Sequence, residues 1–434
     1  MSLHREIQRL SPYKWYGHVR QVTGLMIESV GPQAAIGDLC LIYTGVSNSR
    51  EIKAEVVGFR DDNVLLMPLE DTIQIAPGSL VEATGKPLDV RVGLGLIGQI
   101  VNGAGECLTA EGLLPPLDAY STERKPPNPL DRPRISEVMG LGIKAIDGLF
   151  TVGRGQRIGI FAGSGVGKST LLSMIASHAE ADINVIALIG ERGREVKEFI
   201  ERDLGPAGLK KSVLVVVTSD QPALMRVKGA QTATAIAEYF RDLGMVVNLL
   251  MDSITRFAMA QREIGLAVGE PPTTKGYPPS VFAMLPKLLE RSGTNERGSI
   301  TAFYTVLVDG DDMNEPIADA VRGILDGHLV LDRKLANKGQ FPAINVLKSV
   351  SRVMGDLVTK EHQKAARQVR ERLADFEEAE DLIQIGAYKK GTSSAIDQAV
   401  NVYPDIITLL KQEKDEHLPF SHTVKELIEL SEKG

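Results

Sequence analysis

Residues 157–176 read RIGIFAGSGVGKSTLLSMIA, and this stretch decides the fold. An apolar strand candidate is followed directly by a glycine-rich loop and then by a helix candidate, which is the context that a P-loop requires. Gly163, Gly165 and Gly167 allow backbone N–H groups to converge on phosphates, and the N-terminus of the following helix favours negative charge. The stretch therefore predicts a loop that wraps the phosphates of a nucleoside triphosphate.

The side chains of this loop predict the chemistry of binding. Lys168 can reach the β- and γ-phosphates of ATP, and the hydroxyl of Ser169 can coordinate Mg²⁺. Ala162 replaces the usual first glycine of the motif, which is a mild departure. A chance glycine-rich turn is the alternative, but it explains neither the Lys-Ser pair nor the two flanks. The residues predicted to bind the nucleotide are Gly163, Ser164, Gly165, Val166, Gly167, Lys168, Ser169 and Thr170.

The sequence around the loop alternates strand and helix candidates from residue 135 to residue 352. The strand candidates are RIGIF, NVIALIG, SVLVVV, VVNLLM and TAFYTVLV, and helix candidates such as STLLSMIASHA and ATAIAEYFRDLG lie between them. Continuous apolar strands separated by helices indicate a parallel sheet that is covered on both faces. We therefore expect an α/β, RecA-like P-loop nucleotide domain over residues 135–352.

Segments of different texture flank this domain. Residues 17–93 hold short strand candidates between Gly, Pro, Asp and Asn, which predicts a small β-barrel with a role in oligomerisation. Residues 94–134 are rich in glycine and then in proline, so we expect an irregular connection. Residues 353–434 have charged helical patterns and predict an α-helical domain. Residues 1–16 predict a short polar helix, either frayed or a docking arm.

The composition argues against several classes of function. The 434 residues carry a net charge of −7, and the basic and aromatic residues of a nucleic-acid-binding barrel are missing. Cys40 and Cys107 have no partners at metal-binding spacing, which indicates a reducing compartment. The N-terminus is too polar for a signal peptide, and no apolar run approaches the roughly 18 residues of a membrane span. We therefore expect a cytoplasmic protein without nucleic-acid partners.

Two carboxylates at the ends of strand candidates are candidates for catalysis. Asp252 ends the apolar run VVNLLM, where a carboxylate can hold Mg²⁺; a helix N-cap or turn is its alternative role. Glu191 follows the run NVIALIG, at the sheet edge where a carboxylate can polarise the attacking water. Arg192 is a candidate for orienting Glu191 or for stabilising charge. A solvated loop with surface ion pairs stays an open alternative for Glu191 and Arg192.

The segment FPAINVLKSVSR holds an aromatic residue and an arginine that could serve a nucleotide. An aromatic side chain such as that of Phe341 can stack on adenine. An arginine such as Arg352 can stabilise charge at the γ-phosphate, often from a neighbouring subunit. Taken alone, the two residues are more simply interpreted as a core phenylalanine and a surface arginine.

Together these motifs resemble the catalytic subunits of hexameric rotary-type ATPases over nearly the whole chain. GERGREV resembles the segment of the catalytic glutamate, which implies that Glu191 polarises water. LLMDSITRF resembles the Walker B strand, which implies that Asp252 holds the metal and that Arg256 lies near the γ-phosphate. PAINVLKSVS resembles a family signature, which implies that Arg352 is an arginine finger and Phe341 the adenine-stacking residue.

Within that family, long stretches resemble the ATPases of type III protein export, and specifically the flagellar ones. Among them are GLMIESVGP, TSDQPALMRVKGAQTATAIAEYFRD and TVLVDGDDMNEPIADAVRGILDGHLVLDR. The resemblance implies Mg²⁺-dependent ATP hydrolysis by a homohexamer with a coiled stalk protein in its pore. It also implies a regulatory or stator protein at the N-terminus and docking of export chaperones and substrates. The protein would lie in the cytoplasm, peripherally associated with the inner face of the membrane at the export gate.

Other functions compete with flagellar export. The ATPases of virulence type III secretion are close relatives, and a rotary ATP synthase catalytic subunit is a further alternative. The ATP synthase β subunit is acidic near its stalk-facing loop, whereas the counterpart here, AYKKGTSS, contains Lys389 and Lys390. Glu191 argues against a ring subunit that binds nucleotide without hydrolysing it, and the acidic balance argues against an RNA helicase. Because one chain carries both Glu191 and Arg352, a ring of identical chains could complete an active site at every interface.

Overall fold

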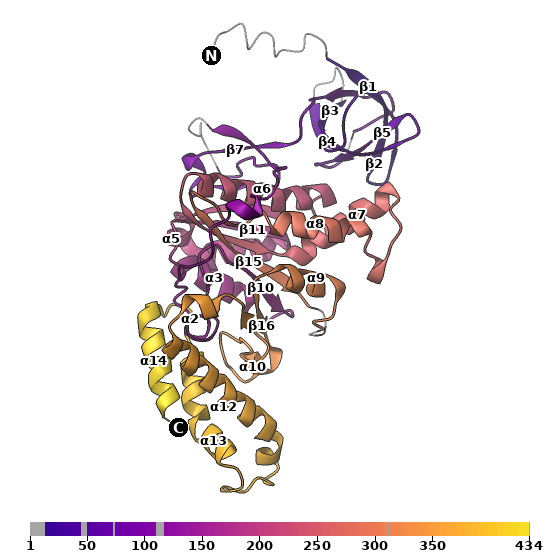
Figure 1. Cartoon of the computed structure of the whole chain (residues 1–434). Helices are drawn as coiled ribbons and strands as arrows, with labels where there is room; N and C mark the ends of the chain where they lie inside the picture. The colour runs from indigo at the N-terminus through magenta and orange to yellow at the C-terminus, as the bar shows by residue number, and fades with distance from the viewer. Residues whose placement is uncertain are drawn as a thin grey trace.

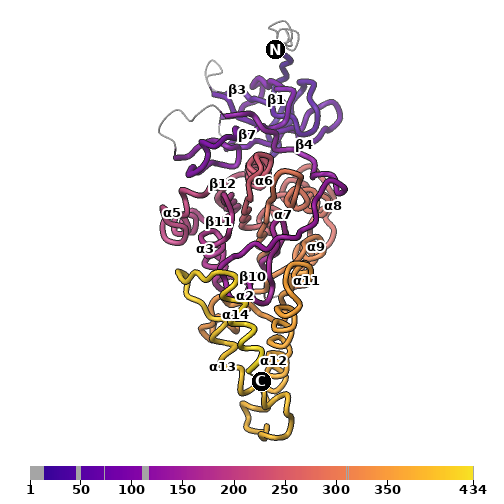
Figure 2. The backbone as a smooth tube through the Cα atoms, turned by 60° about the vertical axis from the view of Figure 1, so that its left-hand side comes forward, coloured from indigo at the N-terminus to yellow at the C-terminus, as the bar shows by residue number. Residues whose placement is uncertain are grey.

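Three parts follow one another along the molecule, with a β-barrel at one end, an α/β domain in the middle and a helical domain at the other end (Figures 1 and 2). The computed structural model describes residues 14–44, 50–72, 74–109, 117–308, 310 and 312–433. The docking helix expected over residues 1–16 lies outside the described residues up to residue 13. Tyr16, where that segment was expected to end, already begins the first strand of the barrel.

The barrel is closed by six strands in the spatial order β1-β2-β5-β4-β3-β6. Inward-facing apolar side chains such as Ile27, Ile42 and Val56 are fully buried in its core. The expected barrel is confirmed, and its first strand, β1, has the sequence YGHVRQVT, which contains no apolar run. The strands are β1 Tyr16–Thr23, β2 Met26–Val30, β3 Leu39–Thr44, β4 Arg50–Arg60, β5 Asn63–Pro68 and β6 Leu80–Ala83.

The central sheet has the order β17-β16-β10-β15-β13-β11-β12-β8, with β14 beside β15. The pairs from β16 to β8 are parallel, and only β17 and β14 pair antiparallel with their neighbours. This confirms the expected parallel sheet. The strands are β8 Ile100–Val101, β10 Arg157–Ala162, β11 Ile183–Glu191, β12 Ser212–Thr218, β13 Val246–Asp252, β14 Gly293–Thr294, β15 Ser299–Leu307, β16 Gly327–Leu331 and β17 Val350–Ser351.

Helices cover both faces of this sheet, as the apolar strands require. Helices α6 to α9 pack into one apolar core, whereas α3 and α4 share a second core with α2 and the C-terminal helices. These helices are α2 Lys144–Leu149, α3 Lys168–His178, α4 Gly193–Glu198, α5 Gly205–Leu209, α6 Ala223–Asp242, α7 Ile254–Val268, α8 Pro279–Leu289, α9 Pro316–Ile324 and α10 Arg333–Asn337.

The C-terminal domain is helical, as expected. Its helices are α11 Met354–Leu357, α12 Lys360–Gln384, α13 Ser394–Leu410 and α14 Phe420–Glu432. The hydroxyl of Thr359 caps α12 by accepting a hydrogen bond from the backbone N–H of His362. The loop between α12 and α13, which contains Lys389 and Lys390, lies at the end of the molecule farthest from the barrel (Figure 1).

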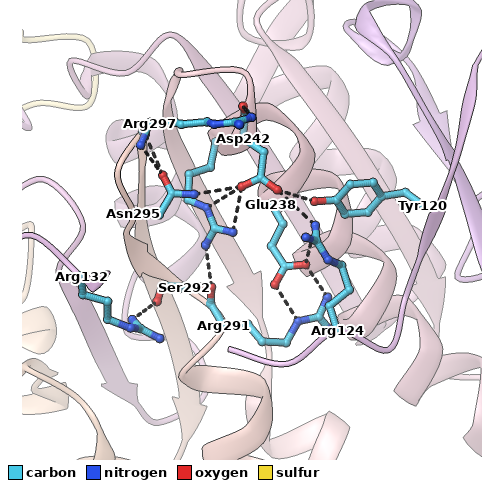
Figure 3. Close-up of polar contacts among 11 residues, drawn as sticks. Tyr120, Arg124, Arg132, Glu238, Asp242, Arg291, Ser292, Asn295 and Arg297 are labelled. Carbon is cyan, nitrogen blue, oxygen red and sulfur yellow. Dashed lines mark hydrogen bonds and ion pairs between the residues drawn. The ribbon is translucent and has the colours of Figure 1, made fainter. Parts of the chain in front are cut away.

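The connection between the barrel and the sheet is more regular than its prolines predicted. Strand β7 (Asp89–Val92) pairs antiparallel with β9 (Asp118–Ser121), and β8 joins the edge of the central sheet. Figure 3 shows the polar contacts that fix this connection to α6. The Tyr120 hydroxyl donates to Asp242 over 2.7 Å, and Arg124 pairs with the same carboxylate at 3.2 Å. Nearby, Arg291 forms a buried two-point ion pair with Glu238 at 2.9 and 2.8 Å.

A buried lysine joins the barrel to the central domain. Lys228 on α6 is only 1% exposed, and its ammonium group pairs with Glu55 of β4 and, at 3.1 Å, with Glu123 of the connection. A buried charge without its partners would be strongly destabilising. The arrangement therefore fixes the orientation of the barrel relative to the nucleotide domain.

Candidate active site

The phosphate-binding loop lies where the sequence predicted it, between the end of β10 and the start of α3. Gly165 and Gly167 have φ values of 76° and 93°, which side chains with a Cβ rarely adopt. Gly167 is the residue before the first helical residue, Lys168, so the N-terminal N–H groups of α3 open toward the loop. Arg333 of α10 donates a hydrogen bond to the carbonyl of Ser164 at 2.9 Å and so holds the outer part of the loop.

A cavity of about 480 Å³ lies over this loop. Its volume falls in the range of small-ligand sites. Most of the predicted site residues line it, namely Gly163, Ser164, Gly165, Gly167, Lys168, Ser169, Thr170, Glu191, Arg192, Asp252 and Arg256. Val166, within the loop, is fully buried and does not line the cavity, and neither do Phe341 and Arg352.

Lys168 is the centre of charge in the cavity. Its Nζ atom lies 2.5 Å from Oδ1 of Asp252 and 3.4 Å from Oε1 of Glu191. The sheet causes this convergence, because β11 and β13 are parallel neighbours and Leu188 pairs with Asp252. Burial disfavours the charge on Lys168, but the two carboxylates outweigh this effect, so the pKa of Lys168 is raised.

Glu191 has the properties of a base that is poised near neutral pH. Its side chain is mostly buried at the end of β11. Burial, followed by the negative charge of Asp252, raises the pKa of Glu191 to about 7, although Lys168 opposes the shift. A general base is most effective when its pKa lies near the working pH.

This pKa predicts how hydrolysis depends on pH. Glu191 can accept a proton only when it is ionised, so we expect kcat/KM for ATP to fall about tenfold per pH unit well below pH 7. Above pH 7 the carboxylate is charged and kcat/KM should level off. Steady-state rates between pH 5 and 8.5 would measure the profile. A flat profile across pH 7 in the free enzyme would show that Glu191 does not limit the reaction.

Three neighbouring side chains refine the predicted site. Arg192 is 79% exposed and pairs with Glu195 at 3.4 Å rather than with Glu191, so orientation of Glu191 by Arg192 is not seen here. Glu195 was missed because Glu191 ends a strand and Glu195 lies on the following helix, so no regular spacing links them; Glu195 lines the cavity and contributes to the raised pKa of Glu191. Arg256 follows the end of β13, and its buried Nε atom has no hydrogen-bond partner among the described residues.

The side chain of Phe341 lies beside Gly167 of the phosphate loop. A Cβ atom on Gly167 would lie 3.4 Å from the Phe341 ring. Phe341 is 45% exposed, whereas a phenylalanine of the hydrophobic core is buried. The carbonyl of Phe341 accepts a hydrogen bond from Gln412, which ties this position to the helical domain. An exposed ring beside the loop has the placement that base stacking requires.

Arg352 lies near the amino-terminal ends of the parallel strands β10 and β16, whereas the phosphate loop follows the carboxyl end of β10. It follows Ser351, which pairs with Gly327 at the start of β16, and Gly327 is level with Ile158 at the start of β10. The loop begins beyond Ala162, four strand residues or about 13 Å farther along β10. The Arg352 guanidinium is exposed and donates to the carbonyl of Arg322 at 3.4 Å. Arg352 therefore cannot serve the cavity of its own chain.

The residues present fit a nucleoside triphosphate and a hard cation. The loop offers backbone N–H groups, Lys168 offers a positive charge, and the unpaired Nε of Arg256 leaves a donor in a cavity-lining side chain. Ser169 and Asp252 supply the oxygen atoms that Mg²⁺ prefers, and Mg²⁺ at phosphate sites needs only one or two protein ligands.

Comparisons with known proteins match each of the three parts. Residues 142–351 match the nucleotide-binding domain of the ATP synthase alpha/beta family, and residues 19–85 match its beta-barrel domain. Residues 358–429 match the T3SS EscN ATPase C-terminal domain.

Individual relatives are similar over nearly their whole length. The chain is 64% identical to the flagellum-specific ATP synthase of Bacillus subtilis (strain 168), covering 98% of this chain and 97% of the relative. It is 47% identical to the type 3 secretion system ATPase of Xanthomonas euvesicatoria, covering 99% and 97%. The assembled ATPase EscN in complex with its central stalk EscO, from enteropathogenic E. coli, superposes with a TM-score of 0.88 at 45% identity, covering 96% and 100%.

Proposed function

Because this chain belongs to the ATP synthase alpha/beta family and, within it, to the ATPases of flagellar and type III protein export, it is an ATP-hydrolysing enzyme. We propose that it works as a homohexameric ring that uses Mg²⁺-dependent ATP hydrolysis to energise flagellar protein export. The observation that carries the proposal is the placement of the charged groups: Lys168, Glu191 and Asp252 meet in one cavity, while Arg352 lies at the opposite sheet edge. A second chain is needed to bring these two edges together.

In this mechanism the charged side chains change partners when ATP binds. Lys168 exchanges its two carboxylates for the β- and γ-phosphates, while the loop N–H groups hold the remaining oxygens. Ser169 and Asp252 would hold Mg²⁺, which would neutralise phosphate charge when bound. Glu191, released from Lys168, orients a water molecule and accepts its proton.

Arg352 of a neighbouring chain completes this site. A guanidinium that faces the γ-phosphate stabilises the charge of the transition state. Arg256, which lines the cavity, is proposed to contact the same phosphate, and Phe341 to stack on the adenine. A head-to-tail contact that joins the two edges of identical chains closes into a ring when the rotation permits.

The proposed partners follow from the relatives and from the exposed loop. EscN forms a complex with a central stalk, and we propose a coiled stalk protein in the pore of this ring as well. The loop with Lys389 and Lys390 offers positive charge to such a stalk. Among the described residues, no helix has the length and apolar character needed to cross a bilayer. We also propose that the chain associates peripherally with the membrane at the export gate, with a regulatory protein at the N-terminus and chaperone-bound substrates as further partners.

Flagellar export is favoured over the alternatives by sequence similarity. Identity is 64% to a flagellum-specific relative and 47% to a type 3 secretion relative of similar coverage. A rotary ATP synthase subunit is disfavoured because residues 358–429 match the EscN C-terminal domain.

Deletion of the chromosomal gene in the source bacterium tests the proposal. We expect loss of flagellin from the culture medium and loss of swimming, both restored by a plasmid copy of the chain but not by Lys168→Ala. Among the described residues, Lys168 is the only side-chain cation paired with Asp252 and Glu191, so Lys168→Ala removes the positive charge proposed to bind the phosphates. Normal flagellin export in the deletion strain, with loss of injected effectors instead, would assign the chain to virulence secretion.

A further inference from the structure

A buried threonine supports the proposed metal-binding carboxylate from the neighbouring strand. Thr305 lies in the apolar run of β15 and is 0% exposed, and no role was predicted for it from the sequence. Strand β15 runs parallel to β13, with Met251 paired to Tyr304, so the next residues, Asp252 and Thr305, lie at the same level. The Thr305 hydroxyl lies 2.7 Å from Oδ1 of Asp252.

The geometry indicates that this hydrogen bond is the main one made by the hydroxyl. The carbonyl of Met251 lies 3.4 Å away, which is much longer than the 2.7 Å to Asp252. A hydroxyl has one proton, and a short bond to a carboxylate is stronger than a bond to a neutral acceptor. Thr305 therefore donates to Asp252.

Lys168 and Thr305 bind the same oxygen of Asp252. Both contacts are to Oδ1, at 2.5 and 2.7 Å. In the proposed mechanism Lys168 leaves Asp252 for the phosphates, and Thr305 then remains as the side-chain donor to this carboxylate. The orientation of Asp252 in the nucleotide-bound enzyme then depends on a fully buried residue that does not line the cavity.

We propose that Thr305 is the positioning residue for Asp252, and that its hydroxyl fixes which carboxylate oxygen faces the divalent cation that accompanies ATP. This inference rests on the proposed function, in which Asp252 holds that cation. Thr305 contributes through Asp252 alone, so its loss should weaken the dependence of nucleotide binding on Mg²⁺ without weakening the phosphate contacts of the loop.

Nucleotide binding to two variants tests the proposal. Thr305→Val keeps the size and branching of the side chain and removes the donor, whereas Thr305→Ser keeps the donor. Titrations with a fluorescent ATP analogue, in EDTA and in excess Mg²⁺, give the factor by which Mg²⁺ tightens binding. We expect Thr305→Val to reduce that factor about tenfold, as for loss of a hydrogen bond to a charged group. Thr305→Ser should retain it, and binding in EDTA should match wild type in both.

The possible outcomes separate this inference from the proposed function. If Mg²⁺ does not tighten binding to the wild-type chain, the metal role of Asp252 in the proposed function fails. If Mg²⁺ tightens binding to wild type and to Thr305→Val equally, Thr305 is not a positioning residue. If Thr305→Val also binds the ATP analogue more weakly in EDTA, Thr305 has a merely structural role. Should Thr305→Val fail to fold, Thr305→Cys, with a weak donor of similar size, takes its place against Thr305→Ser.

Discussion

Replacement of Glu191 by Gln is expected to slow ATP hydrolysis by about 10²- to 10⁴-fold, the range of a general base. The amide has nearly the same shape as the carboxylate but cannot accept the proton of the attacking water. Lys168 keeps its closer partner, Asp252 at 2.5 Å, so the loop should retain its conformation. Because burial already disfavours the charge on Glu191, the neutral amide should not lower the melting temperature.

Two measurements decide this prediction. Single-turnover hydrolysis gives the rate of the chemical step, and equilibrium titration with a fluorescent ATP analogue gives the affinity. Glu198→Gln is the matched control, because Glu198 lies farther along α4 and pairs with Arg194 at the surface. Loss of ATP binding in Glu191→Gln would make Glu191 a structural residue, and turnover near the wild-type rate would require another base.

Replacement of Arg352 by Ala should slow hydrolysis by about 10³- to 10⁵-fold, and the slowed site should be the one in the neighbouring chain. The register of β17, β16 and β10 separates Arg352 from its own phosphate loop, so its guanidinium can act only across an interface. Two inactive variants should therefore restore each other. In a mixed ring, an Arg352→Ala chain keeps Glu191 and can receive the arginine of a Glu191→Gln neighbour.

The size of the recovery can be calculated. With equal amounts of the two variants, half of the sites have Glu191 and half of their neighbours supply Arg352, so about one site in four is complete. ATP hydrolysis after mixing and reassembly measures this fraction. Absence of any recovery in mixed rings would show that both residues act within one chain. Arg322→Ala, which removes a nearby arginine and leaves Arg352 in place, should retain hydrolysis and tests whether any positive charge on this surface suffices.

Sequence patterns predicted most of the fold because the information is local. Continuous apolar runs became β10, β11, β12, β13 and β15, and charged helical spacing became α12. Strand β1 has no apolar run and most of its residues are exposed. Its pairing with β2 and β6, which closes the barrel, is decided by the tertiary structure. The connection was expected to be irregular, yet β7 and β9 pair because Tyr120 and neighbouring residues are held by α6.

Some features of the candidate site are likewise local in the sequence, and others depend on the tertiary structure. The order strand, glycine loop, Lys168, Ser169 and helix is written in consecutive residues, so the sequence by itself determined that a triphosphate-binding loop would form and where. Only the tertiary structure decided three further features. They are the contact of Lys168 with Asp252, the hydrogen bond from Thr305 to Asp252, and the position of Arg352 near the amino-terminal ends of the parallel strands. Each depends on how strands that are distant in the sequence align in one sheet. That alignment comes from helices packed on both faces of the sheet, which no single stretch of sequence encodes.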